Sequence, residues 1–282
     1  WEQVSVTAER LLRAIQAPLP LQRAASTAQV NASMGIALFP ADGEDFETLA
    51  RCADLAMYKS KELGKGRYSF YQPDLDIAFR SRLALERELL QGIAPQELLL
   101  HYQPVFDVSS GRLVGCEALV RWMHPQRGLL MPGTFIQTAE ETGLIRELGL
   151  WTLDAACAQL ASWKAAGLHP GRVAINVSAL QFRDQRLPQV LHTALQTYDI
   201  QPGELELELT ESTLMSDTES AQATVASLRE LGVALAIDDF GTGYSSLSYI
   251  KRLRPDKLKI DRSFVKDLPA DADDRALTEA II

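Results

Sequence analysis

Residues 205–209 read Leu-Glu-Leu-Glu-Leu, so apolar and acidic side chains alternate with a period of two. In a β-strand this alternation places the three leucines on one face and Glu206 and Glu208 on the other. A doubly wound sheet buries both faces of its strands and favours apolar residues on both. A closed barrel tolerates polar side chains near the inward carboxyl ends of its strands. The run therefore favours a barrel.

Strand-like and helix-like stretches alternate from residue 97 onward. Strands are expected at residues 98–105, 113–122, 172–178, 204–210, 233–237 and 257–260. Helices are expected at residues 133–142, 147–166, 183–198, 217–231 and 244–252. This order predicts an α/β fold with a mostly parallel sheet. We assign it to the (β/α)8 TIM-like barrels, with six of the eight strands in this chain.

Four of these strands carry polar side chains at or near their ends. They are Glu117, Asn176, Glu206 with Glu208, and the pair Asp238-Asp239. Burying one unpaired charge costs several kcal/mol, so a group of such residues needs a common partner. Oxygen ligands that converge from separate strands suit hard divalent cations such as Mg²⁺ or Mn²⁺. The sequence thus predicts a metal-dependent enzyme.

Each of these residues also has a plainer interpretation. Glu117, Leu119 and Arg121 share one strand face at period two, which suits a metal ligand beside a phosphate-binding guanidinium. The same spacing equally suits a buried Glu–Arg ion pair. Taken alone, Asn176 fits a cap at a strand end better than a metal ligand. Glu211 lies beyond its strand and equally suits the cap of the following helix.

The stretch Asp-Asp-Phe-Gly-Thr-Gly-Tyr-Ser-Ser at residues 238–246 follows a strand of small residues. Paired aspartates at a strand end suit two bridged cations, and the two glycines allow a sharp loop. The alternative is an ordinary turn before a helix capped by Ser245 or Ser246. Lys259 is predicted to point inward, where nearby cations would disfavour its charged form and let it orient or deprotonate water. An ion pair with Asp261 is the alternative for this lysine.

Composition excludes several classes of protein. The chain has 282 residues, 46% of them hydrophobic, and a formal net charge of −9. Residues 1–85 carry ten acids and ten bases, so the whole charge lies in residues 86–282, which disfavours binding to a nucleic-acid polymer. Three cysteines without a Cys-x-x-Cys pair indicate reduced thiols and a cytoplasmic location, and we interpret Cys116 as a buried residue rather than a nucleophile. No run approaches the ~20 apolar residues of a membrane span.

Several motifs together resemble the EAL domain family. They are Glu117-Ala-Leu119, Asn176, Glu208-Leu-Thr-Glu211, the stretch at 238–246 and Leu258-Lys-Ile-Asp261. That family hydrolyses the bacterial messenger cyclic di-GMP to linear pGpG with Mg²⁺ or Mn²⁺ on a variant (β/α)8 barrel. The resemblance runs from about residue 94 to the C-terminus. We therefore assign residues 94–282 to an EAL phosphodiesterase domain.

The N-terminal part resembles a different family, the GGDEF diguanylate cyclases. Its matching stretch begins with Ser-Met-Gly-Ile-Ala-Leu-Phe-Pro at residues 33–40 and continues to Arg67. We assign residues 1–71 to the C-terminal part of such a domain and residues 72–93 to a connecting helix. The Gly-Gly-Asp/Glu-Glu-Phe signature would precede Trp1, so this fragment is expected to lack cyclase activity. Both ends of the chain are expected to be cut from a longer protein.

The resemblance to EAL domains implies a role for each residue of the predicted site. The first cation would be held by Glu117, Asn176, Glu208 and Asp238, and the second by Asp238 and Asp239. Lys259 would position the water and act with Glu117 and Asp238 as the catalytic set. Substrate would be contacted by Gln103, Leu119 and Arg121, and Glu211 would steady the loop after Asp239. A further metal-site glutamate and a glutamine of the family would lie beyond Ile282.

We therefore predict hydrolysis of one phosphodiester bond of cyclic di-GMP, assisted by two cations roughly 3.5–4 Å apart. A catalytically inactive cyclic di-GMP receptor is the alternative hypothesis. A phosphodiesterase for another cyclic nucleotide or dinucleotide is the third. The loop at residues 241–246 also predicts a homodimer, by the same resemblance.

Overall fold

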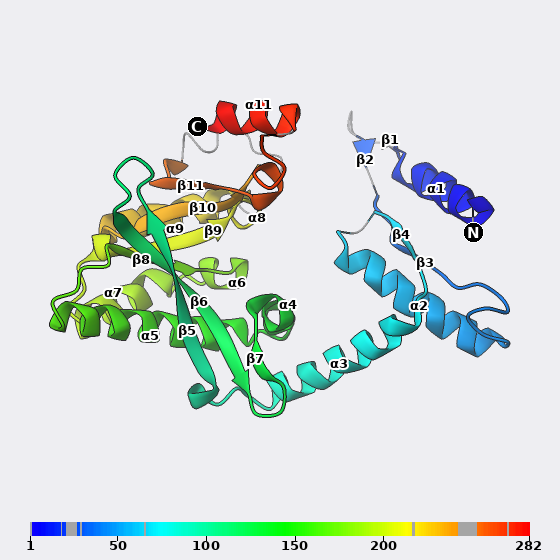
Figure 1. Cartoon of the computed structure of the whole chain (residues 1–282), viewed down its shortest axis with the longest axis horizontal. Coiled ribbons are helices and arrows are strands. Elements are labelled where there is room, and N and C mark those ends of the chain that lie inside the picture. The colour runs from blue at the N-terminus through cyan, green and yellow to red at the C-terminus, as the bar shows by residue number, and fades with distance from the viewer. Residues whose placement is uncertain are drawn as a thin grey trace. The chain divides into compact units, whose positions relative to one another are not determined.

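The structure, a computed structural model, describes residues 2–17, 19–20, 27–28, 30–64, 66–215, 218–241, 253–269 and 271–282. It divides into two compact units, Trp1–Arg87 and Glu88–Ile282. Figure 1 labels the elements of both. We describe each unit by itself.

The first unit is built around a short parallel pair of strands and one helix. Its elements are α1 (Glu2–Gln16), β1 (Leu19–Pro20), β2 (Thr27–Ala28), β3 (Met34–Ile36), α2 (Phe46–Glu62), β4 (Tyr68–Phe70) and α3 (Pro73–Leu90), which continues past Arg87. Asp45 caps α2, because its side chain accepts the backbone N–H of Thr48 at 2.8 Å. A Cβ on Gly35 would lie 1.8 Å from the carbonyl oxygen of Ala53. Glycine in β3 therefore lets α2 pack directly on the strand.

The second unit holds the predicted alternation of strands and helices. Its strands are β5 (Leu98–Phe106), β6 (Leu113–His124), β7 (Gly128–Leu130), β8 (Arg172–Asn176), β9 (Leu205–Thr210), β10 (Ala234–Phe240) and β11 (Lys257–Ile260). Its α-helices are α4 (Pro132–Thr142), α5 (Ile145–Ala165), α6 (Ala179–Phe182), α7 (Leu187–Thr197), α8 (Glu211–Met215), α9 (Thr218–Leu231) and α11 (Ala272–Ile281). Its 3-10 turns are η1 (Pro95–Glu97), η2 (Pro202–Glu204) and η3 (Arg262–Phe264).

The strands form one sheet in the order β11-β10-β9-β8-β6-β5, with β7 paired to β6 outside this path. All pairs from β6 to β11 along the path are parallel, whereas β5 and β7 pair with β6 in the antiparallel sense. The turn before β6 explains the β5–β6 hairpin. Asp107 accepts hydrogen bonds from Ser109 and Ser110, and Gly111 takes the left-handed φ of +65°.

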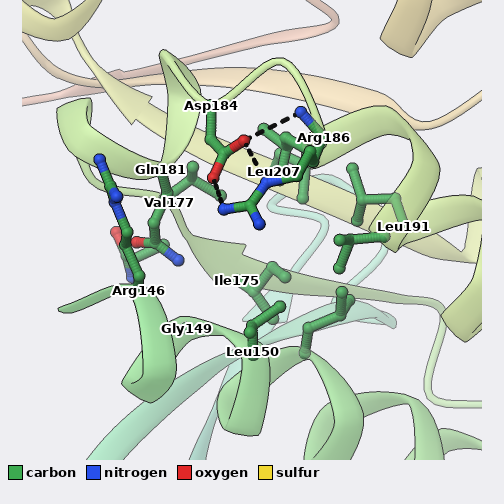
Figure 2. A pocket seen from close by; sticks show the side chains of 14 residues that line it. Arg146, Gly149, Leu150, Ile175, Val177, Gln181, Asp184, Arg186, Leu191 and Leu207 are labelled. Atoms are coloured by element: carbon green, nitrogen blue, oxygen red, sulfur yellow. Dashed lines mark hydrogen bonds and ion pairs between the residues drawn. The ribbon is translucent and has the colours of Figure 1, made fainter. Parts of the chain in front are cut away.

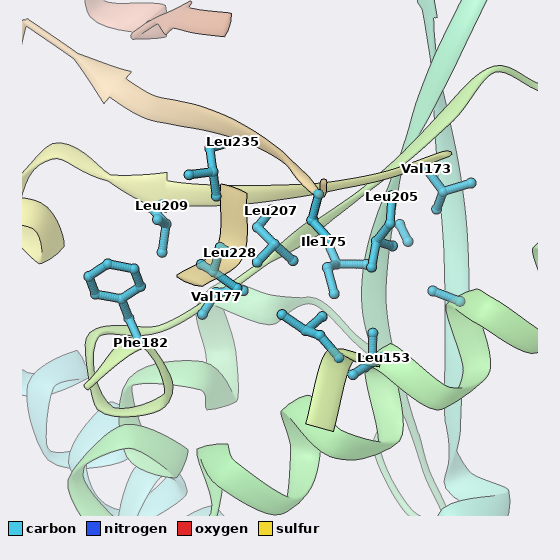
Figure 3. Packing of buried hydrophobic residues seen from close by; sticks show 14 of the residues in the cluster. Leu153, Val173, Ile175, Val177, Phe182, Leu205, Leu207, Leu209, Leu228 and Leu235 are labelled. Atoms are coloured by element: carbon cyan, nitrogen blue, oxygen red, sulfur yellow. The ribbon is translucent and has the colours of Figure 1, made fainter. Parts of the chain in front are cut away.

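The hydrophobic core lies between the outer face of this sheet and the helices α5, α7 and α9. Figure 3 shows Leu205, Leu207 and Leu209 of β9 on the same side of the sheet as Ile175 of β8, facing Leu153 of α5. The prediction that the leucines of residues 205–209 share one face is therefore confirmed. Glu206 and Glu208 are nevertheless also buried. Both faces of β9 lie away from water, and only one is apolar.

The expected helix at residues 244–252, with Ser245 and Ser246 at its start, lies outside the described residues, as does Gly243. The helix expected at 183–198 is shorter, because Asp184-Gln-Arg186 forms a turn before Pro188 at the start of α7. Among the described helices, none is long and apolar enough to cross a membrane. Cys52, Cys116 and Cys157 are buried and form no disulfide.

Candidate active site

The predicted site residues converge from separate strands on the inner face of the sheet. Glu208 of β9 is aligned with Asn176 of β8, and Glu117 of β6 is aligned with Gln103 of β5. Residues aligned on neighbouring strands place their side chains on the same face of a sheet. The structure thus brings together side chains that lie more than 100 positions apart along the chain.

Lys259 of β11 lies at the centre of this convergence. Its ammonium donates to Glu117 Oε2 at 3.0 Å, Glu208 Oε2 at 2.5 Å and Asp238 Oδ2 at 3.1 Å. The predicted inward direction of Lys259 agrees with these contacts. The alternative pair with Asp261 does not, since Asp261 accepts the N–H of Ser263 at 2.8 Å and caps η3.

The pKa values of Glu208 and Lys259 are shifted by burial and by the neighbouring charged groups. Burial raises the pKa of the Glu208 carboxyl to about 7, with a further rise from the charges of Glu117 and Asp238 and an opposing hydrogen bond from Lys259. Burial also works against the charge of Lys259, but its hydrogen bond to Glu208 and the three carboxylates outweigh burial and raise its pKa. Lys259 is therefore an ammonium at neutral pH here, whereas neighbouring cations were expected to disfavour its charge.

Asp238 and Asp239 reach this edge of the sheet through a shift in strand register. Ile237 is aligned with Leu258 and Phe240 with Ile260, so the two aspartates together face Lys259 alone. Asp239 takes a φ of +55°, which is uncommon for a residue other than glycine. Burial, followed by the charges of Asp238 and Asp261, raises the pKa of the Asp239 carboxyl. Adjacent residues of a regular strand point to opposite faces, and the shift brings both carboxylates to one acidic edge.

Asn176 is part of the same cluster. Its side-chain Nδ2 donates to Glu117 Oε1 at 2.7 Å. This contact joins β6 to β8 through two side chains and is not a backbone cap of the kind expected as the alternative. A cation ligand from Asn176 would be the other amide atom, its oxygen.

Arg121 is buried but does not pair with Glu117. Its Nη1 donates to the carbonyl of Val120 at 2.9 Å, and its Nε has no hydrogen-bond partner in the described part of the chain. The Glu–Arg ion pair considered as an alternative is therefore not among the described contacts. An unsatisfied buried donor on a guanidinium is unusual and suits an oxygen-rich ligand.

A groove of about 380 Å³ adjoins these residues, between the helices α4 and α5, the middle of β6 and the carboxyl ends of β8 and β9. Leu119 and Asn176 line it together with Pro132 and Ile136 of α4 and Thr210 of β9. Its walls are largely apolar, and the acidic cluster lies at the strands that form its floor. Such a groove can hold an organic ligand against the polar strand ends.

Glu211 begins α8 directly after β9 and is buried. Its Oε2 accepts the backbone N–H of Gly241 at 3.2 Å, and its Oε1 has no hydrogen-bond partner among the described residues. Gly241 lies two residues after Asp239 and has a φ of +103°. Glu211 thus holds the backbone of Gly241, while residues 242–252 lie outside the described residues.

The chemistry of the donor set suits a hard divalent cation. Within the described residues no three acidic, histidine or cysteine side chains alone form a preformed metal cluster, and the ammonium of Lys259 lies among three of the carboxylates. One positive charge faces three carboxylates, and the pKa of Glu208 is raised to about 7. Added positive charge would relieve this imbalance, and all the donors are oxygens, as Mg²⁺ and Mn²⁺ prefer.

A second hollow, of about 140 Å³, lies on the outer side of β8 between α5 and α7 (Figure 2). Ile175, Leu191 and Leu207 line its apolar part, and Asp184 pairs with Arg186 beside it. Asn176 lines both this hollow and the groove, whereas Glu117, Glu208 and Asp238 line neither. We place the chemistry at the inner edge of the sheet because those three carboxylates meet there on Lys259.

Sequence reasoning named Glu206 as a polar strand residue but gave it no place in the site, and it gave none to Lys257. In the structure Lys257 Nζ donates to Glu206 Oε1 one layer below the pair of Lys259 and Glu208. The sequence carried a signal for this pair, because glutamates alternate with leucines at residues 205–209 and lysines alternate with apolar residues at 257–260.

Comparison with known proteins identifies the family. The EAL domain model matches residues 86–282, and the model "Diguanylate cyclase, GGDEF domain" matches residues 2–67. The chain belongs to the EAL domain family. A solved EAL relative described as "PaMucR Phosphodiesterase, c-di-GMP complex" is 45% identical, with a TM-score of 0.67 over 70% of this chain and 80% of that one. The expected TIM-like barrel of the EAL type and the GGDEF fragment are thereby confirmed.

Two curated relatives match nearly the whole chain and are longer than it. The bifunctional diguanylate cyclase/cyclic di-GMP phosphodiesterase MucR of Pseudomonas aeruginosa is 42% identical over 275 residues, which are 98% of this chain and 40% of that protein. The cyclic di-GMP phosphodiesterase PdeR of Escherichia coli is 37% identical over 275 residues, 98% of this chain and 41% of that protein. The chain thus spans about two fifths of the length of these two relatives.

Proposed function

We propose that this EAL domain hydrolyses cyclic di-GMP to linear pGpG with Mg²⁺ or Mn²⁺. The observation that carries the proposal is the meeting of Glu117, Glu208 and Asp238 on the ammonium of Lys259, with Asn176 bonded to Glu117. Carboxylates are not gathered in this way for stability alone, because like charges in a partly buried site repel. The names of MucR and PdeR supply the substrate.

The ligand set would be divided between two cations. Glu117, Asn176, Glu208 and Asp238 would hold the first, and Asp238 with Asp239 would hold the second. Bound divalent cations supply positive charge that makes water a stronger nucleophile at neutral pH and that neutralises the phosphate. The chain's own contribution is to fix these ligands on four strands, so that little reorganisation is needed during the reaction.

The remaining groups would bind and orient the reactants. Arg121 offers a buried donor without a partner in the described structure, which suits a phosphate oxygen, and Gln103 lies across from Glu117. Leu119 lines the apolar groove that would hold the organic part of the substrate. The three N–H groups of Lys259 donate to Glu117, Glu208 and Asp238 in this arrangement, and a carboxylate that turned to a cation would leave one of them to hold the attacking water. Water adds to phosphorus and gives up one proton, one bond from phosphorus to a ribose 3′-oxygen breaks, and that oxygen takes up one proton, so no net proton is gained or lost at these two oxygens.

The test is product analysis with the full-length protein. Cyclic di-GMP is incubated with Mg²⁺ or Mn²⁺, with EDTA in a parallel sample, and the nucleotides are separated by chromatography. We expect pGpG in the metal samples and none with EDTA. Cyclic GMP and cyclic AMP serve as comparison substrates, and faster turnover of either would overturn the assigned substrate.

The inactive receptor is the second candidate, and the salt-bridged state of Lys259 is the observation that favours it. An ammonium that already neutralises three carboxylates competes with a cation for the same oxygens. Tight binding of cyclic di-GMP without any product at saturating Mn²⁺ would establish the receptor and exclude the enzyme.

We also propose that the EAL domain works as a homodimer in the cytoplasm. The proposal of a dimer rests on the resemblance of residues 241–246 to the EAL family, and of these residues only Gly241 is described. The location rests on three unpaired cysteines. Sedimentation velocity with and without cyclic di-GMP tests the dimer, and a monomer under both conditions would exclude it.

A further inference from the structure

The groove beside the candidate active site contains two polar side-chain groups that none of the roles above uses. Its other polar side chains with printed contacts are hydrogen-bonded within the chain. They are Thr152, Asn176, Ser178 and Thr210. The carboxylate of Glu140 and the side-chain NH2 group of Gln181 have no hydrogen-bond partner among the described residues. A largely apolar groove thus offers one free acceptor and one free donor.

The amide of Gln181 is held in one orientation. Its Oε1 accepts the backbone N–H of Ser178 at 3.0 Å and the hydroxyl of the same residue at 2.8 Å, within the capping box of α6. A backbone N–H can only donate, so the amide atom that it contacts is the oxygen and the other is the nitrogen. The NH2 group of Gln181 is therefore left to donate to a ligand.

Gly149 of α5 leaves the space that this amide occupies. A Cβ on Gly149 would lie 1.6 Å from Gln181 Nε2, so any other residue there would displace the amide (Figure 2). Glycine inside a helix is less favourable than alanine, because it loses more backbone entropy on folding. The glycine at this position is thus explained by the Gln181 amide and not by the helix.

Glu140 supplies the acceptor from α4, close to the end of that helix at Thr142. Burial, followed by the charge of Glu141, raises the pKa of the Glu140 carboxyl. A carboxylate that lines an apolar groove without a donor is unfavourable, and the N–H groups of a ligand would stabilise it. Leu119 and Asn176 line the same groove, so such a ligand would also lie beside the proposed metal site.

An acceptor and a donor in this groove match the edge of guanine and oppose that of adenine. Guanine carries two donors, N1–H and its N2 amino group, beside the acceptor O6. Adenine carries the acceptor N1 beside its N6 amino donor. A carboxylate can accept from both guanine donors while an amide NH2 donates to O6. Against adenine the carboxylate would meet the lone pair of N1, and the NH2 group would meet another donor.

We propose that Gln181 and Glu140 recognise a guanine base in this groove and discriminate against adenine, with Gly149 leaving room for the Gln181 amide. This inference rests on the proposed function and deepens it, because it names the residues that select the base of the cyclic dinucleotide. A site built to hydrogen-bond its ligand discriminates strongly, since the wrong ligand leaves its polar groups unpaired.

The test measures the Kd values of cyclic di-GMP and cyclic di-AMP by isothermal titration of the full-length protein in EDTA, without metal-dependent turnover. Wild type should bind cyclic di-GMP at least roughly tenfold more tightly. Gln181→Glu keeps an oxygen for the capping box on Ser178 but replaces the donor by an acceptor. It should weaken cyclic di-GMP binding roughly 10–100-fold and remove the preference. Glu140→Gln, which replaces one acceptor oxygen by a donor, should also lower the preference.

Gly149→Ala tests the space without changing either polar group. Alanine should favour α5 and keep the fold, yet lower the preference for cyclic di-GMP because it displaces the Gln181 amide. Gly203→Ala is the matched control, since a Cβ there meets nothing within 4 Å and Gly203 lies in η2, outside the groove. Its two Kd values should equal those of wild type.

This inference and the proposed hydrolysis can fail separately. The expected base preference without any pGpG would refute hydrolysis and support the recognition of guanine. Formation of pGpG by a protein whose preference survives Gln181→Glu, Glu140→Gln or Gly149→Ala would overturn this inference alone. Wild type that bound both dinucleotides equally, or neither, would also overturn it.

Discussion

The two faces of β9 are equally hidden from water and do opposite things. On the outer face Leu205, Leu207 and Leu209 are 0–1% exposed and form the core with the helices (Figure 3). On the inner face Glu206 and Glu208 are 0% and 2% exposed, and each contacts a lysine two strands away. Burial alone therefore does not distinguish the residues that stabilise the fold from those of the candidate site. The two sets differ in the chemistry of the side chains that they contact.

The outer face stabilises the fold through apolar area, which needs only suitable size and shape. The inner face carries charges, and the cost of removing them from water is offset by the groups that they pair with. Neutral substitutions there should change the free energy of unfolding little and the catalytic rate strongly. Substitutions at adjacent positions of one strand should thus have opposite consequences.

The largest effect is expected for Glu208→Gln. The amide keeps the volume of the side chain but replaces an anionic cation ligand by a neutral one, so kcat should fall roughly a thousandfold or more, as expected for several kcal/mol of lost transition-state stabilisation. Stability should change by less than about 1 kcal/mol, because burial already disfavours the charge of Glu208 and Lys259 keeps two carboxylates. Steady-state kinetics and urea unfolding measure the two quantities. Normal turnover in a folded variant would refute the site.

The matched change on the outer face is Leu207→Ala. Leu207 is fully buried, so the free energy of unfolding should fall by about 2–5 kcal/mol. The value of kcat per folded molecule should fall far less than in Glu208→Gln. If instead kcat collapsed while stability held, the proposed division between the faces would be wrong.

A smaller effect is expected for Glu211→Gln. The amide oxygen can still accept the N–H of Gly241, but the charge that strengthens this bond is lost. We expect kcat to fall roughly tenfold, the lower end of the range for groups that support a ligand. Glu211→Ala, which removes the acceptor, should be slower than Glu211→Gln. Equal rates in wild type and Glu211→Ala would exclude a role for this contact.

The smallest effect concerns the thiol of Cys157 in the core. Burial raises its pKa to about 11, with a further rise from Asp154, from an ordinary value of 9.0. The unfolded thiol ionises first, so this contribution to stability is complete below pH 9 and declines as the pH rises toward 11. At pH 8 a thiol reagent should modify Cys157 only through opening of the fold. Leu207→Ala should speed this labelling, whereas Glu208→Gln should not, as mass spectrometry of the labelled peptide can show.

Much of this arrangement could be predicted because it follows from local pattern. The period of two in residues 205–209 and the alternation of Lys257 with Lys259 specify which side chains share a face. The placement of Glu117, Asn176, Glu208 and Asp238 at one edge follows once the strands are parallel. The EAL resemblance supplied their roles.

What escaped prediction depends on pairing between distant strands. The register shift that sets Asp238 and Asp239 against Lys259, and the φ of +55° at Asp239, exist only when β10 meets β11. The pair of Lys257 and Glu206 requires three strands and a small residue between them. The local sequence also could not decide whether Glu211 begins a helix or holds a loop. In the structure it does both, because it begins α8 and accepts the N–H of Gly241.

The central claim is that the inner face of this sheet is a metal-dependent phosphodiesterase site. The most direct measurement follows pGpG formation from cyclic di-GMP as Mn²⁺ is titrated into full-length wild type and Glu208→Gln at equal folded concentration. We predict saturable, Mn²⁺-dependent product from wild type and at least roughly a thousandfold less from the folded variant. Equal rates in both proteins, or product from wild type in EDTA, would contradict this assignment.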